Sequence, residues 1–347
     1  MKQLLPLLTA TLLLGACGGN ERPATTPEPE PAAVNVYSHR HYDTDKALFE
    51  RFTQETGIPV NLVMADDDEV LARLEQEGAS SPCDLLITSD AGRLGLAAER
   101  GLLQPSGDAG LDALVPAHLR DGQGRWYALT MRARVVAYHK DKVDPATIAT
   151  YDDLTRPDWK GRLLVRSSAN IYNQSLVSAL VAHEGREKAL AWCQGIVANM
   201  AREPKGGDTD QMLALAEGQG DVAIVNSYYA GKLLTSDEPE KQAAAQVIGI
   251  VFPSLGTHGT HVNVSGAGLA AHAPHKPEAL KLLHFLLGSE AQAAFAEGNK
   301  EYPVRAGVPV APVLQGFGEL VPDSLPLEEL ARNNATAVMV MEEAGWR

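Results

Sequence analysis

The sequence has few basic residues and few aromatic residues, and it lacks the motifs of several enzyme classes. Its 347 residues contain 30 Lys and Arg against 44 Asp and Glu, a formal net charge of −14. Nucleic-acid binding needs a basic face to neutralise phosphates, so this acidic balance argues against it. The patterns G-x-S-x-G and H-E-x-x-H and the phosphate-binding loop are all missing, so common hydrolase chemistry finds no support.

Cysteines are also scarce, and only two follow residue 17. Cys83 falls at the start of an expected strand and Cys193 on an expected helix, in different halves of the chain. We therefore expect two buried free thiols rather than a disulfide. With 45% hydrophobic and 21% charged residues, the chain is otherwise typical of a globular protein with one large or two medium domains.

The only long apolar run lies at the start of the chain. It contains Lys2, then an apolar stretch, then the letters LGA directly before Cys17, as in the lipobox of bacterial lipoproteins. We expect residues 1–17 to be a lipoprotein-type signal whose Cys17 becomes an acylated N-terminus, in the periplasm or on another extracytoplasmic membrane face. An ordinary signal peptide with an incidental cysteine is the alternative. Residues 18–33 are rich in Pro and Glu and are expected to be a disordered tether.

From Val34 onward, short β-prone runs alternate with helical patterns, which predicts an α/β fold with mostly parallel strands. The expected strands cover 34–38, 59–64, 84–88, 132–140, 162–167, 221–227, 246–252 and 264–270. The expected helices cover 43–56, 67–77, 91–100, 173–186, 187–199, 209–218, 228–235, 276–287 and 289–297. Asp208 is the expected N-cap of the helix at 209–218.

Two doubly wound lobes fit this length better than one oversized sheet. The chain would cross between the lobes at the strand-like segments 132–140 and 252–264. The expected bounds are 34–131 with 262–305 for lobe one, 138–257 for lobe two, and 306–347 for a C-terminal helical segment.

Tyrosines occupy several turns that lead from a strand into a helix, where open α/β sheets bind their ligands. Four of the nine tyrosines lie at such turns, namely Tyr42, Tyr172, Tyr228 and Tyr229. One alone would be an ordinary half-buried turn residue, but four at equivalent edges indicate a shared site. Phenolates are hard oxygen donors that a trivalent cation can hold deprotonated at neutral pH. The cluster therefore favours ferric iron over calcium or magnesium, which prefer carboxylates and carbonyls.

These residues and several longer segments resemble a known family, the ferric-iron solute-binding proteins of bacterial ABC importers, particularly its cyanobacterial-type branch. The resemblance covers essentially all of 34–347. Its most specific segments are VNVYSHRHYDTDKALFERF (34–52), SPCDLLITSDAGRLGLAAERGLLQ (81–104), MRARVVAYHKDKVDP (131–145), GGDTDQM (206–212), GDVAIVNSYYAGKL (220–233) and EYPVRAGV (301–308). It implies a two-lobed, type II periplasmic-binding-protein fold, the Venus flytrap, with iron in its cleft and delivery to a membrane permease. We expect a monomer that performs no catalysis.

The resemblance also assigns roles to individual residues. The family ligands fall on Tyr42 of lobe one, on Tyr172, Tyr228 and Tyr229 of lobe two and, as an accessory ligand, on His41. Arg132 matches a family arginine near the metal, where it would offset phenolate charge or hold a synergistic anion such as carbonate. Four phenolates around Fe³⁺ leave a net charge of −1, which one nearby cation would balance.

Two further basic residues lie close to these positions in the sequence. Arg134 is two positions beyond Arg132, on the same face of the expected strand, and is the alternative candidate for the same role. Lys232 lies one helical turn after Tyr228 and Tyr229 and could supply a second cation. A solvated helix surface is the expected position for Lys232.

Three alternatives to a ferric-iron site remain open. His39 with His41, and His258 with His261, form pairs that could bind zinc or ferrous iron. The same fold could bind a small organic or oxyanion solute in an aromatic cage, although only 5% of the residues are aromatic. A metal-dependent hydrolase built on the histidine pairs is the third alternative, and its turnover would be lost on chelation.

Overall fold

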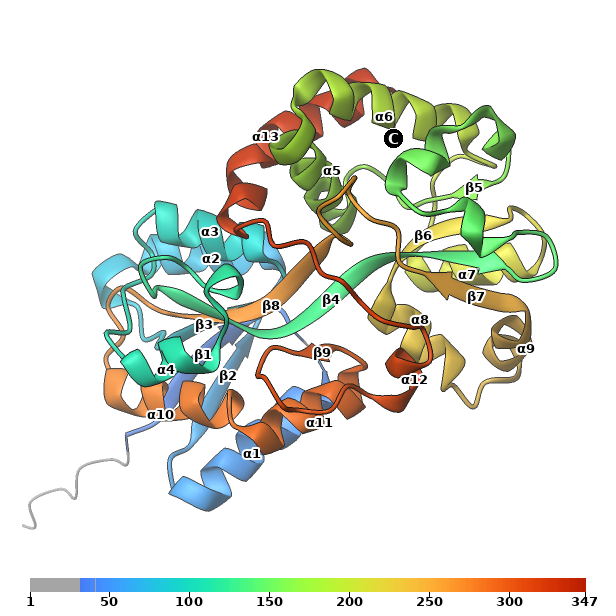
Figure 1. The fold of residues 1–347 in the computed structure, drawn as a ribbon. Coiled ribbons are helices and arrows are strands. Elements are labelled where there is room, and N and C mark those ends of the chain that lie inside the picture. Colours follow the sequence, from blue (N-terminus) through green and yellow to red (C-terminus); the bar gives the residue numbers. More distant parts are fainter. Residues whose placement is uncertain (1–31, 41) are drawn as a thin grey trace, which may run out of the picture. The chain divides into compact units, whose positions relative to one another are not determined.

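The computed structural model describes residues 32–40 and 42–347, which form a mixed α/β fold (Figure 1). The expected signal, with Cys17, and all but the last two residues of the expected tether lie outside the described residues. Within the part of the chain that is described, no helix is long and apolar enough to cross a membrane.

The strands of the described residues join into one sheet. They are β1 (Val34–Ser38), β2 (Val60–Met64), β3 (Leu85–Thr88), β4 (Trp126–His139), β5 (Leu163–Leu164), β6 (Val222–Asn226), β7 (Ile248–Val251), β8 (Val262–Leu269) and β9 (Tyr302–Pro303). Their order is β2-β1-β3-β8-β4-β6-β5, with β7 and β9 paired to β4. Three of these pairs are parallel and five are antiparallel. The expectation of mostly parallel strands is therefore wrong, because β4 and β8 run against their neighbours.

The long strand β4 joins two halves of this sheet. Its first half pairs with β8 and β9, and its second half pairs with β6 and β7 (Figure 1). The strand expected at 132–140 begins at Trp126 instead, since the apolar segment WYALTM is buried along its whole length. The predicted lobe bounds stay a prediction, because contacts join Ala32–Arg347 into one unit.

Helices cover the sheet and connect its strands. They are α1 (Asp43–Thr56), α2 (Asp67–Glu77), α3 (Ala91–Glu99), α4 (Ala109–Leu114), α5 (Ile171–Glu184), α6 (Arg186–Asn199), α7 (Asp208–Ala216), α8 (Ser227–Leu234), α9 (Pro239–Val247), α10 (Lys276–Leu286), α11 (Ser289–Asn299), α12 (Pro312–Gln315) and α13 (Glu328–Glu343). Every expected helix is present, with its ends within two residues of the expected bounds. The strands expected at 162–167 and 246–252 shorten to β5 and β7, and α9 takes the first two residues of the latter.

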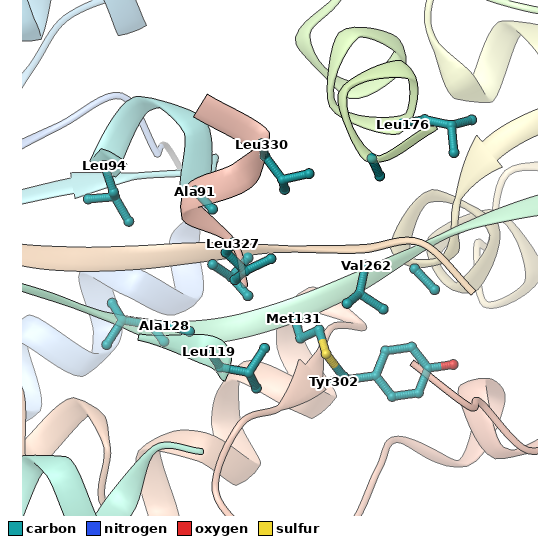
Figure 2. Packing of buried hydrophobic residues seen from close by; sticks show 14 of the residues in the cluster. Ala91, Leu94, Leu119, Ala128, Met131, Leu176, Val262, Tyr302, Leu327 and Leu330 are labelled. Carbon is teal, nitrogen blue, oxygen red and sulfur yellow. The ribbon is translucent and has the colours of Figure 1, made fainter. Parts of the chain in front are cut away.

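The C-terminal helix α13 packs against helices on both halves of the sheet. It contacts α3 on one half and α5 and α6 on the other. Leu327 and Leu330 at its start are buried in the same apolar cluster as Ala91 of α3 and Leu176 of α5 (Figure 2). Burying a leucine side chain stabilises a fold by roughly 1.5–3 kcal/mol, so the C-terminal segment is part of the core.

The two cysteines that the structure describes, Cys83 and Cys193, are buried and free, as expected. Burial raises the pKa of Cys193 to about 12 and raises that of Cys83 as well. A buried thiol that stays protonated is a poor nucleophile, so both residues act as small apolar side chains.

Candidate metal-binding site

A pocket of about 300 Å³ brings the four predicted tyrosines together. It is lined by His39, Arg40, Tyr42, Ser89, Tyr172, Tyr228, Tyr229 and Lys232. The tyrosines come from three separate turns of the chain, each located where a helix begins. His41 lies outside the described residues.

Tyr42 enters the pocket from the start of α1. It is the N-cap residue of that helix, and its carbonyl accepts the N–H of Asp45 at 3.1 Å. Asp43 and Asp45 in the first turn suit the positive end of the helix dipole. Gly57, with φ of 73°, ends the helix in the left-handed conformation that favours glycine. The local sequence alone therefore places Tyr42 at the helix start.

Tyr172 is the second residue of α5. The side chain of Asn170 caps this helix by accepting the N–H of Tyr172 at 3.1 Å. The hydroxyls of Tyr172 and Tyr228 lie 3.1 Å apart and form a hydrogen bond. Since Tyr172 follows the short strand β5 and Tyr228 follows β6, the parallel pairing of β5 and β6 brings these two turns to one edge of the sheet.

Tyr228 and Tyr229 stand in the first turn of α8. Their ring centroids are 4.2 Å apart and their planes are tilted by 33°. Tyr228 is 3% exposed, whereas Tyr229 is partly exposed. The pair therefore presents one enclosed and one accessible phenol to the same pocket.

Burial keeps three phenols of the pocket, those of Tyr42, Tyr172 and Tyr228, protonated in the metal-free protein. It raises the pKa of Tyr172 to about 12, and it also raises the pKa of Tyr42 and, most strongly, of Tyr228. Tyr229 adds to the rise at Tyr172, and the charge of Arg132 opposes it. A ligand that binds these oxygens as phenolates must replace their protons, which a highly charged cation does.

Lys232 and Arg40 supply positive charge in this pocket. The Lys232 ammonium lies 4.3 Å from the ring centroid of Tyr42 and 5.5 Å from that of Tyr228. Burial lowers the pKa of Lys232, which the charge of Glu301 partly opposes. The expected solvated position for Lys232 is therefore wrong, because the tyrosine rings cover this face of α8.

Arg40 is a pocket residue that the sequence reasoning missed. Its guanidinium lies 4.9 Å from the ring centroid of Tyr42. It pairs with Asp45 at 2.8 Å and with Glu301 at 3.4 Å, and its side chain is 1% exposed. The sequence did indicate this ion pair, because Asp45, in the first turn of α1, follows Arg40 by five residues.

Arg132 and Arg134 are both buried, and neither lines the tyrosine pocket. The guanidinium of Arg132 lies 5.5 Å from the ring centroid of Tyr172 and 3.6 Å from the carboxylate of Asp90. Arg134 donates to Asp208 at 2.7 Å and to Asn173 at 2.7 Å. Those bonds hold the Arg134 side chain in place, and the anion-binding role expected of Arg132 or Arg134 stays a prediction.

Asp208 is likewise not the expected helix cap. It is the first residue of α7, whose N-cap is Gly207, and its side chain is fully buried. It accepts from Arg134 and from the backbone N–H of Asn226, each at 2.7 Å. Asp210 performs the capping instead, because its carboxylate accepts the N–H of Gly207.

His258 and His261 do not form a second metal site, and the pair of His39 with His41 lies partly outside the described residues. His39 hydrogen-bonds Ser89 at 2.6 Å, and His258 stacks on His183 with ring centroids 4.0 Å apart. His261 is buried against Ser175, and burial lowers its pKa to about 3. Among the described residues, no group of three or more His, Cys, Asp or Glu could hold a metal ion.

Comparisons with known proteins agree with this fold. Residues 47–316 match the family described as bacterial extracellular solute-binding protein. Iron uptake protein A1 of Synechocystis sp. (strain ATCC 27184 / PCC 6803 / Kazusa) is 45% identical over 342 residues, which are 98% of this chain and 95% of that protein. The major ferric iron-binding protein of Neisseria meningitidis serogroup B (strain ATCC BAA-335 / MC58) is 25% identical over 333 residues, covering 93% of this chain and 96% of that protein.

Solved structures show the same likeness. The Trichodesmium protein IdiA (FutA), in complex with iron and citrate ligands, matches with a TM-score of 0.88 at 46% identity, over 91% of this chain and 100% of that one. Apo FutA2 from Synechocystis PCC6803 matches with a TM-score of 0.86 at 44% identity, over 92% and 100%. These matches confirm the predicted two-lobed α/β fold class. The chain therefore belongs to the family of bacterial extracellular solute-binding proteins, in the group that contains these iron-binding relatives.

Proposed function

We propose that this chain is the extracytoplasmic solute-binding component of an ABC importer, and that it captures ferric iron. The ligands would be the phenolates of Tyr42, Tyr172, Tyr228 and Tyr229, with His41 as an accessory ligand. The captured ion is passed to a membrane permease, and no covalent chemistry is involved. The names of the relatives, which include an iron uptake protein and a ferric iron-binding protein, support this cargo.

One observation carries the proposal: four phenols from three separate turns line a single pocket. Phenolate oxygens are hard ligands, and ferric iron is the abundant biological cation with enough charge to hold several of them deprotonated at neutral pH. Among the described residues that line the pocket, none carries a carboxylate. Calcium and magnesium bind mainly through carboxylates and carbonyls, so this pocket does not suit them.

The charges of the pocket suit a trivalent ion. Four phenolates around Fe³⁺ sum to −1, and the ammonium of Lys232 in the same pocket brings the sum to zero. Arg40 is already paired with Asp45 and Glu301, so Lys232 is the balancing cation. The positive charge of Arg132, which lies close to the ring of Tyr172, would also stabilise the phenolate of that ligand.

Capture would occur by closure of the lobes. Tyr172, Tyr228 and Tyr229 belong to the predicted lobe two and take up the ion first, and Tyr42 of lobe one completes the shell. The ion stabilises the closed state because it binds that state more tightly than the open one. The permease would then open the lobes and accept the iron. A monomer, anchored by an acyl chain on Cys17, fits this role.

The test is a visible absorption spectrum of the protein titrated aerobically with chelated ferric iron. A broad phenolate-to-iron charge-transfer band is expected in the parent protein. It should disappear when all four pocket tyrosines are changed to Phe. A protein that stays colourless, or a quadruple variant that keeps the band, would overturn the tyrosyl ferric site.

Tyr302→Phe is the matched control for this titration. Tyr302 is 6% exposed and does not line the pocket, and its hydroxyl has no hydrogen-bond partner within the described protein. Removing that hydroxyl takes away a buried phenol without breaking a hydrogen bond. The band should therefore keep its position and intensity in this variant.

A further inference from the structure

Helix α8 meets residues from the opposite half of the sheet across the tyrosine pocket. The helix follows β6, which pairs with the second half of β4, and it carries Tyr228 and Tyr229 in its first turn. Across the pocket, Tyr42 follows β1 and Glu301 precedes β9, which pairs with the first half of β4. Contacts between α8 and these residues therefore join the two halves directly beside the pocket.

Lys232 of α8 makes the first such contact. Its ammonium lies 4.3 Å from the ring centroid of Tyr42 and 5.5 Å from that of Tyr228. A cation over the face of an aromatic ring is attracted by the electrons of the ring, and more strongly where water is excluded. Because Tyr42 and Tyr228 belong to different halves of the sheet, this one ammonium holds a ring from each.

Charged groups on the far side of the pocket also attract this ammonium. Burial lowers the pKa of Lys232, and the charges of Glu301 and Asp45 oppose this fall. The charge of Arg40 adds to the fall, but by less than Glu301 opposes it. The electrostatic interaction between Lys232 and the opposite half is therefore attractive.

Gly231 makes the second contact, which depends on its lack of a side chain. A Cβ atom at this position would lie 2.9 Å from Cβ of Lys300 and 3.2 Å from a methyl carbon of Leu314. Lys300 follows α11 with a φ of 57°, and among the described residues no other residue except glycine has a positive φ. Such a conformation is uncommon for a residue with a Cβ atom. Here it places the stem of Lys300 against the backbone of α8.

We propose that Gly231 and Lys232 form a latch that holds the two halves of the sheet together in the metal-free protein. Lys232 supplies the attraction, and Gly231 allows the close approach. The closed arrangement is therefore populated before a cation arrives, and the cation shifts an equilibrium that already contains it. The latch depends on contacts that do not involve the proposed iron-binding function, so its test uses no iron.

The test measures the distance between the two halves by pulsed electron paramagnetic resonance, in protein kept metal-free with a chelator. Spin labels at Gln54→Cys on α1 and Gln242→Cys on α9 report on opposite halves, since both side chains are exposed. Cys83 and Cys193 are buried, and Cys17→Ser removes the remaining thiol. The parent protein should show a closed distance beside an open one. The open distance alone would overturn the proposal.

Variants of α8 test the two contacts separately. Lys232→Met keeps a long side chain but removes its charge, and it should lower the ratio of closed to open protein by about 5- to 30-fold. Gly231→Ala should lower the ratio as well, without weakening α8, because alanine favours a helix more than glycine does. Lys232→Arg keeps the cation and should keep most of the closed protein. An unchanged ratio in Lys232→Met would overturn the proposal.

Two controls separate the latch from other effects. Lys241→Met removes a cation from α9 that pairs with Glu238 at 2.6 Å, and it should leave the ratio unchanged. Tyr42→Phe keeps the ring and should keep the ratio, whereas Tyr42→Leu removes the ring and should lower it as Lys232→Met does. Equal ratios in the Phe and Leu variants would contradict a latch that acts through the ring.

Discussion

The buried ion pair between Asp208 and Arg134 gives the sharpest stability prediction. The two side chains are 0% and 1% exposed, and their charged atoms are 2.7 Å apart. Arg134 also donates to Asn173, next to Tyr172, and Asp208 accepts the N–H of Asn226, which precedes the helix of Tyr228. The pair therefore connects the two turns that carry Tyr172, Tyr228 and Tyr229. We expect Asp208→Asn to be strongly destabilising.

The magnitude follows from the burial. Replacing the carboxylate with an amide leaves the guanidinium of Arg134 buried without its counter-charge, which costs about 3–5 kcal/mol. For the about 315 described residues, the entropy of unfolding is on the order of 0.66 kcal/mol per kelvin. The midpoint of thermal unfolding should therefore fall by roughly 5–8 °C.

The assay is thermal unfolding of the metal-free protein followed by circular dichroism. Glu238→Gln is the control, because Glu238 pairs with Lys241 at 2.6 Å but its side chain is 66% exposed. An exposed pair contributes about 0–1 kcal/mol, so this midpoint should move by less than about 2 °C. Equal shifts in the two variants would refute the reasoning, since burial would then not decide the value of the pair.

Three further predictions concern closure, charge and pH. Tyr42→Phe should keep weak iron loading but lose the compaction on loading, and small-angle scattering that shows the same compaction as the parent would contradict capture by closure. Lys232→Met leaves the loaded site at −1 and should weaken ferric affinity by about 10-fold or more, as measured by competition with a chelator, whereas unchanged affinity would remove Lys232 from the charge balance. His261 has a folded pKa of about 3, below its ordinary value of about 6.5, so the unfolded chain binds the extra proton as the pH falls through this window. The protein should be about 2 kcal/mol less stable at pH 5 than at pH 7 from this group, and urea unfolding of His261→Gln should show a correspondingly smaller pH dependence.

Helices were predictable from the sequence because their signals are local. The acids of the first turn and Gly57 mark the ends of α1, and the expected 43–56 agrees with its observed bounds. Strand lengths were less predictable, because a strand exists only where a partner lies beside it. β4 begins at Trp126 since β8 pairs with its first half, and β5 shrinks to two residues because its pairing with β6 covers only two positions.

The candidate site was partly readable for the same reason. A tyrosine between a strand and the helix that follows lies at the ligand-binding edge of an α/β sheet, so the four tyrosines could be recognised together, although one alone would be an ordinary turn residue. Lys232 could not, because its exposure depends on tyrosine rings from another part of the chain. Arg134 and Asp208 are 74 positions apart, and the local sequence around either residue does not indicate that the two form an ion pair.

The sequence by itself determined the α/β class, the bounds of nine of the helices and the tyrosines at the turns, because these follow from local periodicity, capping and turn chemistry. Only the tertiary structure decided which turns share one pocket, which arginine is neutralised and which lysine faces the phenols. Those outcomes depend on distances between residues that are far apart in the chain, and the pairing of β4 with β6 and β8 sets several of them. The charge balance around Tyr172 is the clearest case, because five charged residues from four segments of the chain meet there only after folding.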